Sequence, residues 1–216
     1  MDNLAQIHIY RMVHIENIPH ILEHGIVHKK SPNVNLSYIS IGDTSLIDTR
    51  TTKTVNISNG SRFQSYGSIV LGELIPFYFG VRMPMLYVMQ IGGNYVERAT
   101  PPQNIVYVVC NVSEIILSEI GFYFSDGHAT DNLSLFYDKS KVQELPDIVD
   151  KNAITAKFWN DNLDIKRKKQ AEFLVADDIP ATLLTGFVCY NETAKQRLIE
   201  MGVEEEKIKI RPQDYY

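Results

Sequence analysis

Apolar residues along the chain gather in short runs separated by polar segments. Apolar positions at helical spacing predict helices at 16–24 and 192–201, which end at Gly25 and Gly202. Shorter helices are predicted at 44–49 and 112–118. Runs rich in β-branched and aromatic residues predict strands at 7–13, 68–71, 78–79, 85–90, 105–110, 121–124, 171–175, 186–190 and 207–211. This mixture predicts an α+β fold with mixed sheets of short strands and flanking helices.

The segment from 29 to 67 differs from the rest of the chain, because Ser, Thr, Asn, Asp and Gly replace most of its apolar residues. Apart from the short helix at 44–49, its composition predicts a long loop. Loops of this length in a compact domain usually carry function. We therefore expect this segment to contribute to a site.

Length and composition predict one folded domain over residues 1–216. A chain of 216 residues that is 44% hydrophobic can bury a core without a disulfide or a metal. Cys110 and Cys189 each lie in an apolar run, which predicts two free buried thiols. The 21 Lys and Arg residues against 26 Asp and Glu give a net charge of −5, which argues against a histone-like nucleic-acid binder. A local basic patch is still compatible with this acidity.

Two features argue against a membrane or exported protein. The first residues carry Asp2 where a signal peptide has a cationic segment. The most apolar stretch, 67–93, lacks the roughly 20 uninterrupted apolar residues of a membrane helix. It is interrupted by Glu73, Pro76, Arg82 and Pro84. We expect a cytoplasmic protein that makes no membrane contact.

The motifs of common cofactor sites are missing from the sequence. Its six histidines include His20 and His24 at helical spacing, but no Cys pair, HExxH motif or carboxylate cluster completes a metal site. The glycine patterns of Rossmann, P-loop and serine-hydrolase sites are also missing. We expect no metal and none of these three classes of enzyme.

Four polar features remain after this exclusion. Taken singly, each is explained by helix capping, surface charge or a solvated helix face. They are the strand end at 10–14, Arg50, the turn at 125–128 and the cationic run at 166–172.

Among these features, Glu172 is the residue that capping, surface charge or a solvated helix face explains least well. It begins an apolar strand directly after a cationic run at 166–169. A half-buried, electropositive setting of this kind keeps a carboxylate ionised beside anionic ligands. Tyrosines elsewhere in the chain, together with such cations, provide the combination on which nucleobases stack.

Five blocks of the sequence, in order, resemble the DarT family. These toxins, from toxin–antitoxin systems of the DarT–DarG type, ADP-ribosylate bases in single-stranded DNA and use NAD. No single block is decisive, but the ordered set covers nearly the whole chain. The blocks are YRMVHIENIPHILEHG at 10–25, SIGDTSLIDTR at 40–50, IPFYFGVRMPMLY at 75–87, SDGHA at 125–129 and KKQAEFLV at 168–175.

The resemblance implies a single-domain ADP-ribosyltransferase fold of the PARP type and a set of site residues. Glu172 would be the catalytic glutamate and Arg50 the second catalytic residue. The segment 33–50 would cover NAD, and 129–172 would contain the loop that recognises the substrate. Many ADP-ribosyltransferases have His where this chain has Arg11, which leaves the contact made by that residue open. By resemblance, NAD would be bound by Arg11, Met12, Val13, His20, His28 and Arg50, and DNA by Tyr78, Arg82, Met85, His128, Arg167 and Lys168.

The resemblance predicts a toxin that transfers ADP-ribose from NAD to a base in single-stranded DNA, with thymine ahead of guanine. It also predicts a macrodomain-type or other ADP-ribosylglycohydrolase antitoxin as partner, and we expect a monomer. Two alternatives stay open: an ADP-ribosyltransferase that acts on RNA or protein, and an inactive nucleic-acid-binding module. The presence of both Arg50 and Glu172 argues against the inactive module.

Overall fold

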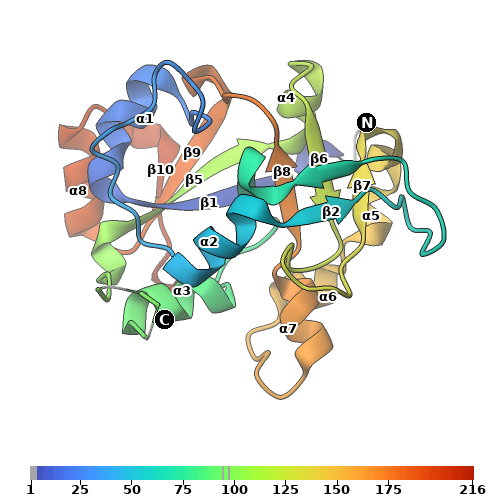
Figure 1. The fold of residues 1–216 in the computed structure, drawn as a ribbon. Coiled ribbons are helices and arrows are strands. Elements are labelled where there is room, and N and C mark those ends of the chain that lie inside the picture. The colour runs from blue at the N-terminus through green and yellow to red at the C-terminus, as the bar shows by residue number, and fades with distance from the viewer. Residues whose placement is uncertain (1–3, 94, 97) are drawn as a thin grey trace.

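A mixed eight-stranded sheet forms the centre of the molecule (Figure 1). The computed structural model describes residues 4–93, 95–96 and 98–216. Asp2, on which the expectation about a signal peptide depends, lies outside the described residues. The strand order is β10-β9-β5-β1-β4-β8-β6-β7, and β2 and β3 form a second, two-stranded sheet. Neighbouring strands are antiparallel except for β10 and β9.

The strands and helices follow one another as short elements. The strands are β1 (His8–His14), β2 (Thr54–Asn56), β3 (Ser68–Val70), β4 (Ile75–Tyr78), β5 (Ile105–Asn111), β6 (Phe122–Ser125), β7 (Phe136–Asp138), β8 (Glu172–Val175), β9 (Leu184–Cys189) and β10 (Ile208–Ile210). The helices are α1 (Ile18–His24), α2 (Thr44–Thr52), α3 (Pro84–Ile91), α4 (Val112–Leu117), α5 (Leu145–Ile148), α6 (Lys151–Thr155), α7 (Leu163–Lys169) and α8 (Glu192–Glu200). The expected α+β single-domain fold is confirmed.

One predicted element has the wrong type. The strand expected at 85–90 is helix α3. Pro84 occupies its first turn, where the missing N–H costs nothing, and Leu86 and Met89 are buried three residues apart on one helical face. The strand expected at 78–79 begins earlier, as β4, and ends at Tyr78.

The core lies on both faces of the sheet because β5, between β9 and β1, is buried along its whole length. One face of β5 presents Val106, Val108 and Cys110 to the larger apolar cluster, which includes residues of α1, α4 and α8. The opposite face presents Tyr107 and neighbouring residues to a second cluster that includes α3. Helices therefore pack on both sides of these strands.

Both cysteines are free and buried, as the sequence predicts. Burial raises the pKa of the Cys110 thiol to about 12 and that of the Cys189 thiol to about 11. Each thiol therefore stays protonated at neutral pH and packs as a small apolar side chain.

The middle of the sheet brings the site residues together. Tyr10 on β1 is paired with Tyr78 on β4, and Tyr78 is paired with Glu172 on β8. Helix α2 lies across these central strands in Figure 1. Among the described residues, we find no helix whose length and apolar character would let it cross a membrane.

Candidate active site

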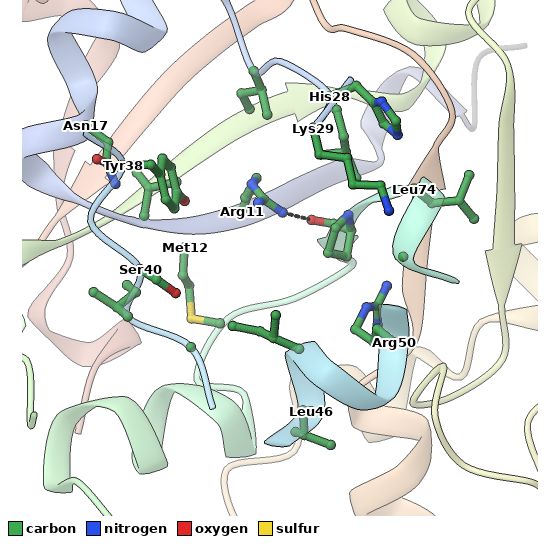
Figure 2. Close-up of a pocket in the computed structure, with 18 of the residues that line it drawn as sticks. Arg11, Met12, Asn17, His28, Lys29, Tyr38, Ser40, Leu46, Arg50 and Leu74 are labelled. Atoms are coloured by element: carbon green, nitrogen blue, oxygen red, sulfur yellow. Dashed lines mark hydrogen bonds between the residues drawn. The ribbon is translucent and has the colours of Figure 1, made fainter. Parts of the chain in front are cut away.

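A cavity of about 580 Å³ lies between β1, α1, α2 and the segment that leads into α2. This volume is typical of a site for a small molecule or cofactor. Figure 2 shows Arg11 from β1 and Arg50 from α2 reaching into the same space. Residues of the polar segment, among them Val34 and Tyr38, line the cavity as well. The segment that composition marks as a long loop thus forms one wall of the site.

Arg50 and Glu172 form an ion pair beside this cavity. The Arg50 Nη1 atom donates to Glu172 Oε2 over 2.8 Å, and the Arg50 side chain is 15% exposed. Glu172 is fully buried rather than half-buried, because β8 lies in the interior of the sheet between β4 and β6. The Nη2 atom of Arg50 is buried and has no hydrogen-bond acceptor within the described part of the chain. A buried donor without a partner is costly unless a ligand supplies the acceptor.

Helix α2 is held in place by its ends rather than by an apolar face, since none of its residues is buried. The Asp43 carboxylate caps the helix by accepting from the backbone N–H of Leu46 over 3.1 Å. Near the other end, Gly72 permits a close approach, because a Cβ there would lie 2.7 Å from the Thr51 Cα. The last turn of α2, which carries Arg50, can therefore pack closely against the turn Leu71–Glu73 that leads into β4.

The turn after β6 fixes the second oxygen of Glu172. The backbone N–H of Ala129 donates to Glu172 Oε1 over 2.9 Å, while the backbone N–H of Glu172 donates to Ser125 Oγ over 3.2 Å. Both carboxylate oxygens of Glu172 thus accept a hydrogen bond, one of them from a cation. Bonds of this kind fix the orientation of the carboxylate.

Tyr78 and His128 lie beside this pair and line the cavity. Burial, followed by the charge of Glu172, raises the pKa of Tyr78 well above its usual value, so its hydroxyl stays protonated. Burial lowers the pKa of His128, although Glu172 acts in the opposite direction, so the ring is neutral at neutral pH. The Nδ1 atom of His128 lies 2.8 Å from the Thr130 hydroxyl, which fixes the ring.

The three expected cofactor residues on β1 have different environments. Arg11 Nη1 donates to the Pro76 carbonyl over 2.9 Å, and this bond links β1 to β4. Met12 and Val13 also line the cavity, but both are buried, and Val13 belongs to the apolar core. Val13 is therefore best placed to act through its backbone.

His20 and His28 also line the cavity, and His28 is fixed by its neighbours. His28 Nε2 lies 2.9 Å from the Glu73 carbonyl, and the backbone N–H of His28 donates to Asp178 Oδ1 over 2.5 Å. The ring of His20 packs against that of His24, with 4.6 Å between centroids.

Sequence reasoning missed Asn17, which attaches the polar segment to α1. The Asn17 amide donates to the Ile39 carbonyl and accepts from the Ile39 N–H, each over 2.9 Å. The side chain is 1% exposed and therefore satisfied. A buried Asn just before a helix resembles an ordinary cap in the sequence, so only the structure reveals this bracing role.

The six residues expected to bind DNA do not all lie at the cavity. Tyr78, Met85 and His128 line it, whereas Arg82, Arg167 and Lys168 do not. Lys168 pairs with Asp164 at 3.0 Å and with Asp150 at 3.4 Å.

Arg167 is buried and points into the protein. Its guanidinium donates to Asp126 over 2.9 Å and to Asp164 over 3.0 Å, while its carbonyl accepts from the His128 N–H over 2.9 Å. Gly127 permits close packing there, because a Cβ would lie 2.4 Å from Arg167 Nη1 and 2.8 Å from Ser134 Oγ. Arg167 thus supports the turn that carries His128 and Ala129.

The cationic run at 166–169 is not a uniformly solvated helix face. Lys169 is 1% exposed, and its ammonium donates to the Ile154 carbonyl over 2.8 Å. Burial lowers its pKa to about 8, and Arg82 acts in the same direction. Across 4–93, 95–96 and 98–216, no three His, Cys, Asp or Glu side chains gather in a way that could hold a metal ion.

Comparison with known proteins identifies the class to which this cleft belongs. Residues 10–216 match the family described as "ssDNA thymidine ADP-ribosyltransferase, DarT". A DNA ADP-ribosyl transferase of Escherichia coli O127:H6 is 31% identical over 193 residues, which cover 88% of this chain and 83% of that protein. A DNA ADP-ribosyl transferase–DNA ADP-ribosyl glycohydrolase fusion protein of Thermosipho africanus is 27% identical over 168 residues, which cover 77% of this chain and 38% of the fusion protein.

The fold matches solved structures over almost its whole length. DarT of Thermus sp. 2.9 in complex with ADP-ribosylated ssDNA superposes with a TM-score of 0.82 at 26% identity, and the match covers 97% of this chain and 96% of that one. The same Thermus protein in complex with NAD+ gives a TM-score of 0.77, with 97% and 98% covered. These matches define an ADP-ribosyltransferase that acts on DNA.

More narrowly, the chain belongs to the DarT family of single-stranded DNA thymidine ADP-ribosyltransferases. The expected activity and the preference for thymine are therefore confirmed at the level of the family.

Proposed function

We propose that this chain transfers ADP-ribose from NAD to thymidine in single-stranded DNA, with Glu172 and Arg50 as its catalytic residues. The observation that carries the assignment is the 2.8 Å pair between Arg50 and the buried Glu172 beside the cavity. A fixed carboxylate in a site of low polarity stabilises positive charge that develops on a sugar during cleavage of its glycosidic bond.

The reaction breaks one glycosidic bond and forms another. The bond between the ribose C1′ atom and the nicotinamide nitrogen breaks, and its electron pair leaves with nicotinamide. A ring nitrogen of the thymine then bonds to C1′ and releases its proton. Glu172 stabilises the charge that develops on the ribose, and Arg50 both orients Glu172 and supplies a positive charge beside the cofactor.

The cavity provides the polar groups that NAD needs. The unpartnered Nη2 of Arg50 fits an anionic acceptor such as a phosphate oxygen. Around it, Arg11, Met12, Val13, His20 and His28 would form the rest of the cofactor site. Arg11 would act while tied to Pro76, which is a different arrangement from the histidine found there in many ADP-ribosyltransferases.

The DNA site would begin where Tyr78, Met85 and His128 line the cavity beside Glu172. Arg82 would extend this site outside the cavity. We assign Arg167 an indirect role, because its ion pairs already occupy its guanidinium and support the turn at 125–129. Lys168 would contribute positive charge near the same DNA site. Its pairing with Asp164 reduces that contribution.

We further propose a partner that removes the modification, an ADP-ribosylglycohydrolase of the macrodomain or another type, and a monomeric enzyme in the cytoplasm. Support for the partner comes from the Thermosipho africanus relative, whose name joins a DNA ADP-ribosyl transferase to a DNA ADP-ribosyl glycohydrolase. The two activities are thus found in one chain in that relative.

Mass spectrometry of oligonucleotides incubated with the protein and NAD tests the proposal directly. The substrates are a single strand containing thymine but no guanine, one containing guanine but no thymine, the duplex of the first strand, and a matching RNA. We expect the mass of one ADP-ribosyl group to be added to the thymine strand alone. Addition to guanine would overturn the base assignment, and transfer only to RNA or to added protein would overturn the assignment to DNA.

A further inference from the structure

Exposed aromatic and apolar side chains gather beside α3 and the loop that leads into α7. Phe158 and Leu163 are 91% and 80% exposed, and Tyr87 on α3 is 43% exposed. Single exposed apolar side chains are ordinary, so these exposures alone do not mark a binding surface. None of these three residues lines the cavity beside Arg50.

The ring of Tyr87 contacts the half-buried rings of Trp159 and Tyr216, and we call these three rings the aromatic platform. The ring of Tyr87 meets that of Trp159 edge to face at 6.3 Å and that of Tyr216 at 5.3 Å. Trp159 Nε1 also donates to the Tyr216 hydroxyl over 2.9 Å. Edge-to-face contacts and a hydrogen bond hold the rings in fixed planes, so little ordering is needed when a ligand binds.

Two cations that form no ion pair within the described part of the chain border the platform. The Lys166 ammonium lies 5.3 Å from the centroid of the Trp159 ring, and the Arg82 guanidinium lies 4.6 Å from that of Tyr216. Arg82 Nε is buried without a hydrogen-bond acceptor among the described residues. Their neighbours Arg167 and Lys168, in contrast, are neutralised by aspartates. The platform therefore combines aromatic rings with two positively charged side chains that form no ion pair among the described residues.

Two helices, α3 and α7, connect the platform with the candidate active site. Helix α3 carries Met85, which lines the cavity, and it also carries Tyr87, which points to a different side of the helix two residues later. Helix α7 carries Lys166 and leads into β8, which begins with Glu172. Figure 1 shows α3 and α7 on the same edge of the molecule, below α2. A strand with one base at Glu172 would thus have its neighbouring nucleotides near this edge.

We propose that the aromatic platform stacks a base of single-stranded DNA that flanks the modified thymidine, while Lys166 and Arg82 contact the adjoining phosphates. This inference rests on the proposed function, because it extends the DNA site of the same reaction. Unpaired bases present their faces to such rings, and phosphates match the two cations. In a duplex the base faces are stacked on one another, so the platform selects single strands.

Tryptophan fluorescence tests the stacking without any need for transfer. Trp159 is the only tryptophan of the chain, so the intrinsic tryptophan signal comes from the platform alone. We expect saturable quenching when a single strand that extends well beyond one thymidine is added, and much weaker quenching by its duplex. An unchanged signal at saturating single strand would overturn the proposal.

Kinetics with a short and an extended single strand give a second test. Trp159→Ala should raise the KM for the extended strand about 5- to 150-fold, the range expected for loss of one stacked base. The KM advantage of the extended over the short strand should shrink accordingly. Trp159→Phe keeps a ring and should preserve most of that advantage, which guards against an Ala variant that fails to fold. Equal losses on both strands would overturn the stacking role.

A matched control is provided by Phe63, which is 99% exposed in the connection between β2 and β3. Phe63→Ala removes an equally exposed ring and should leave both KM values unchanged. Failure of the two proposals can be told apart. A wild-type protein that modifies neither strand contradicts the proposed function, whereas one that modifies both strands with equal KM contradicts only the platform.

Discussion

Replacing Glu172 by glutamine separates the charge of this side chain from its shape. Glu172→Gln keeps the side-chain size, and an amide oxygen can still accept from the Ala129 N–H, which now donates over 2.9 Å. The carboxylate that accepts from Arg50 is lost, and the pair is largely buried, with the two side chains 15% and 0% exposed. Loss of one such charge-assisted hydrogen bond costs about 1.5–3 kcal/mol of stability. We therefore expect a folded but less stable protein.

Catalysis should suffer more than folding in this variant. A preorganised group that stabilises transition-state charge contributes roughly 100- to 1,000-fold to kcat, which corresponds to about 3–4 kcal/mol. We expect a kcat reduced by at least this factor, with Arg50 still present to bind NAD. Glu172→Ala would add a cavity and leave Arg50 without its partner, at a cost of about 3–5 kcal/mol in stability.

The assay is the rate of ADP-ribosyl addition to a thymine-containing single strand at saturating NAD, beside urea unfolding of each variant. Asp177→Asn is the matched control, because it removes an exposed acid close to the end of the same strand. A Glu172→Gln protein that retains more than about a tenth of the wild-type kcat would refute the electrostatic role assigned to the carboxylate.

Two further predictions concern the cations of α7. Arg167→Met should lower kcat by loosening the turn at 125–129 and leave the salt dependence of DNA binding unchanged. Lys166→Met should instead reduce by about one the magnitude of the slope of the logarithm of the DNA-binding constant against the logarithm of the salt concentration. Equal slope changes in the two variants would show that Arg167 contacts phosphate. Lys169 has its pKa lowered by burial to about 8, so the unfolded chain binds more protons than the folded one between about pH 8 and 10.5. The difference in unfolding free energy between the wild type and Lys169→Met should therefore rise by about 3 kcal/mol from about pH 8 to pH 10.5 in favour of the wild type. If urea unfolding gives the same difference at both pH values, the burial of a charged lysine is contradicted.

Much of the fold could be predicted from local pattern, and the exceptions have physical causes. Strand β5 and helix α8 follow from β-branched runs, apolar spacing and a terminal glycine. Helix α3 was predicted as a strand because Met, Leu, Tyr and Val fit either element over so short a run. Only its packing through Leu86 and Met89 selects the helix.

The site residues could be proposed from resemblance, but their arrangement could not. The burial of Glu172 depends on β8 lying between β4 and β6, and strand order in a sheet is a long-range property. For the same reason, the cationic run gave no sign that Arg167 and Lys169 are buried while Lys166 stays beside Trp159. The aspartate that neutralises Arg167 from the β6 turn is 41 residues away in the sequence.

The sequence separation of Arg50 and Glu172, which is 122 residues, has a consequence for synthesis of the protein on the ribosome. The arginine is made well before β8, the strand that carries the glutamate, because 122 residues separate the two. Strand β5 completes its pairing with β9 later still. Nascent chains therefore hold an incomplete site until both β8 and β9 have emerged, and they cannot be competent enzymes before that point.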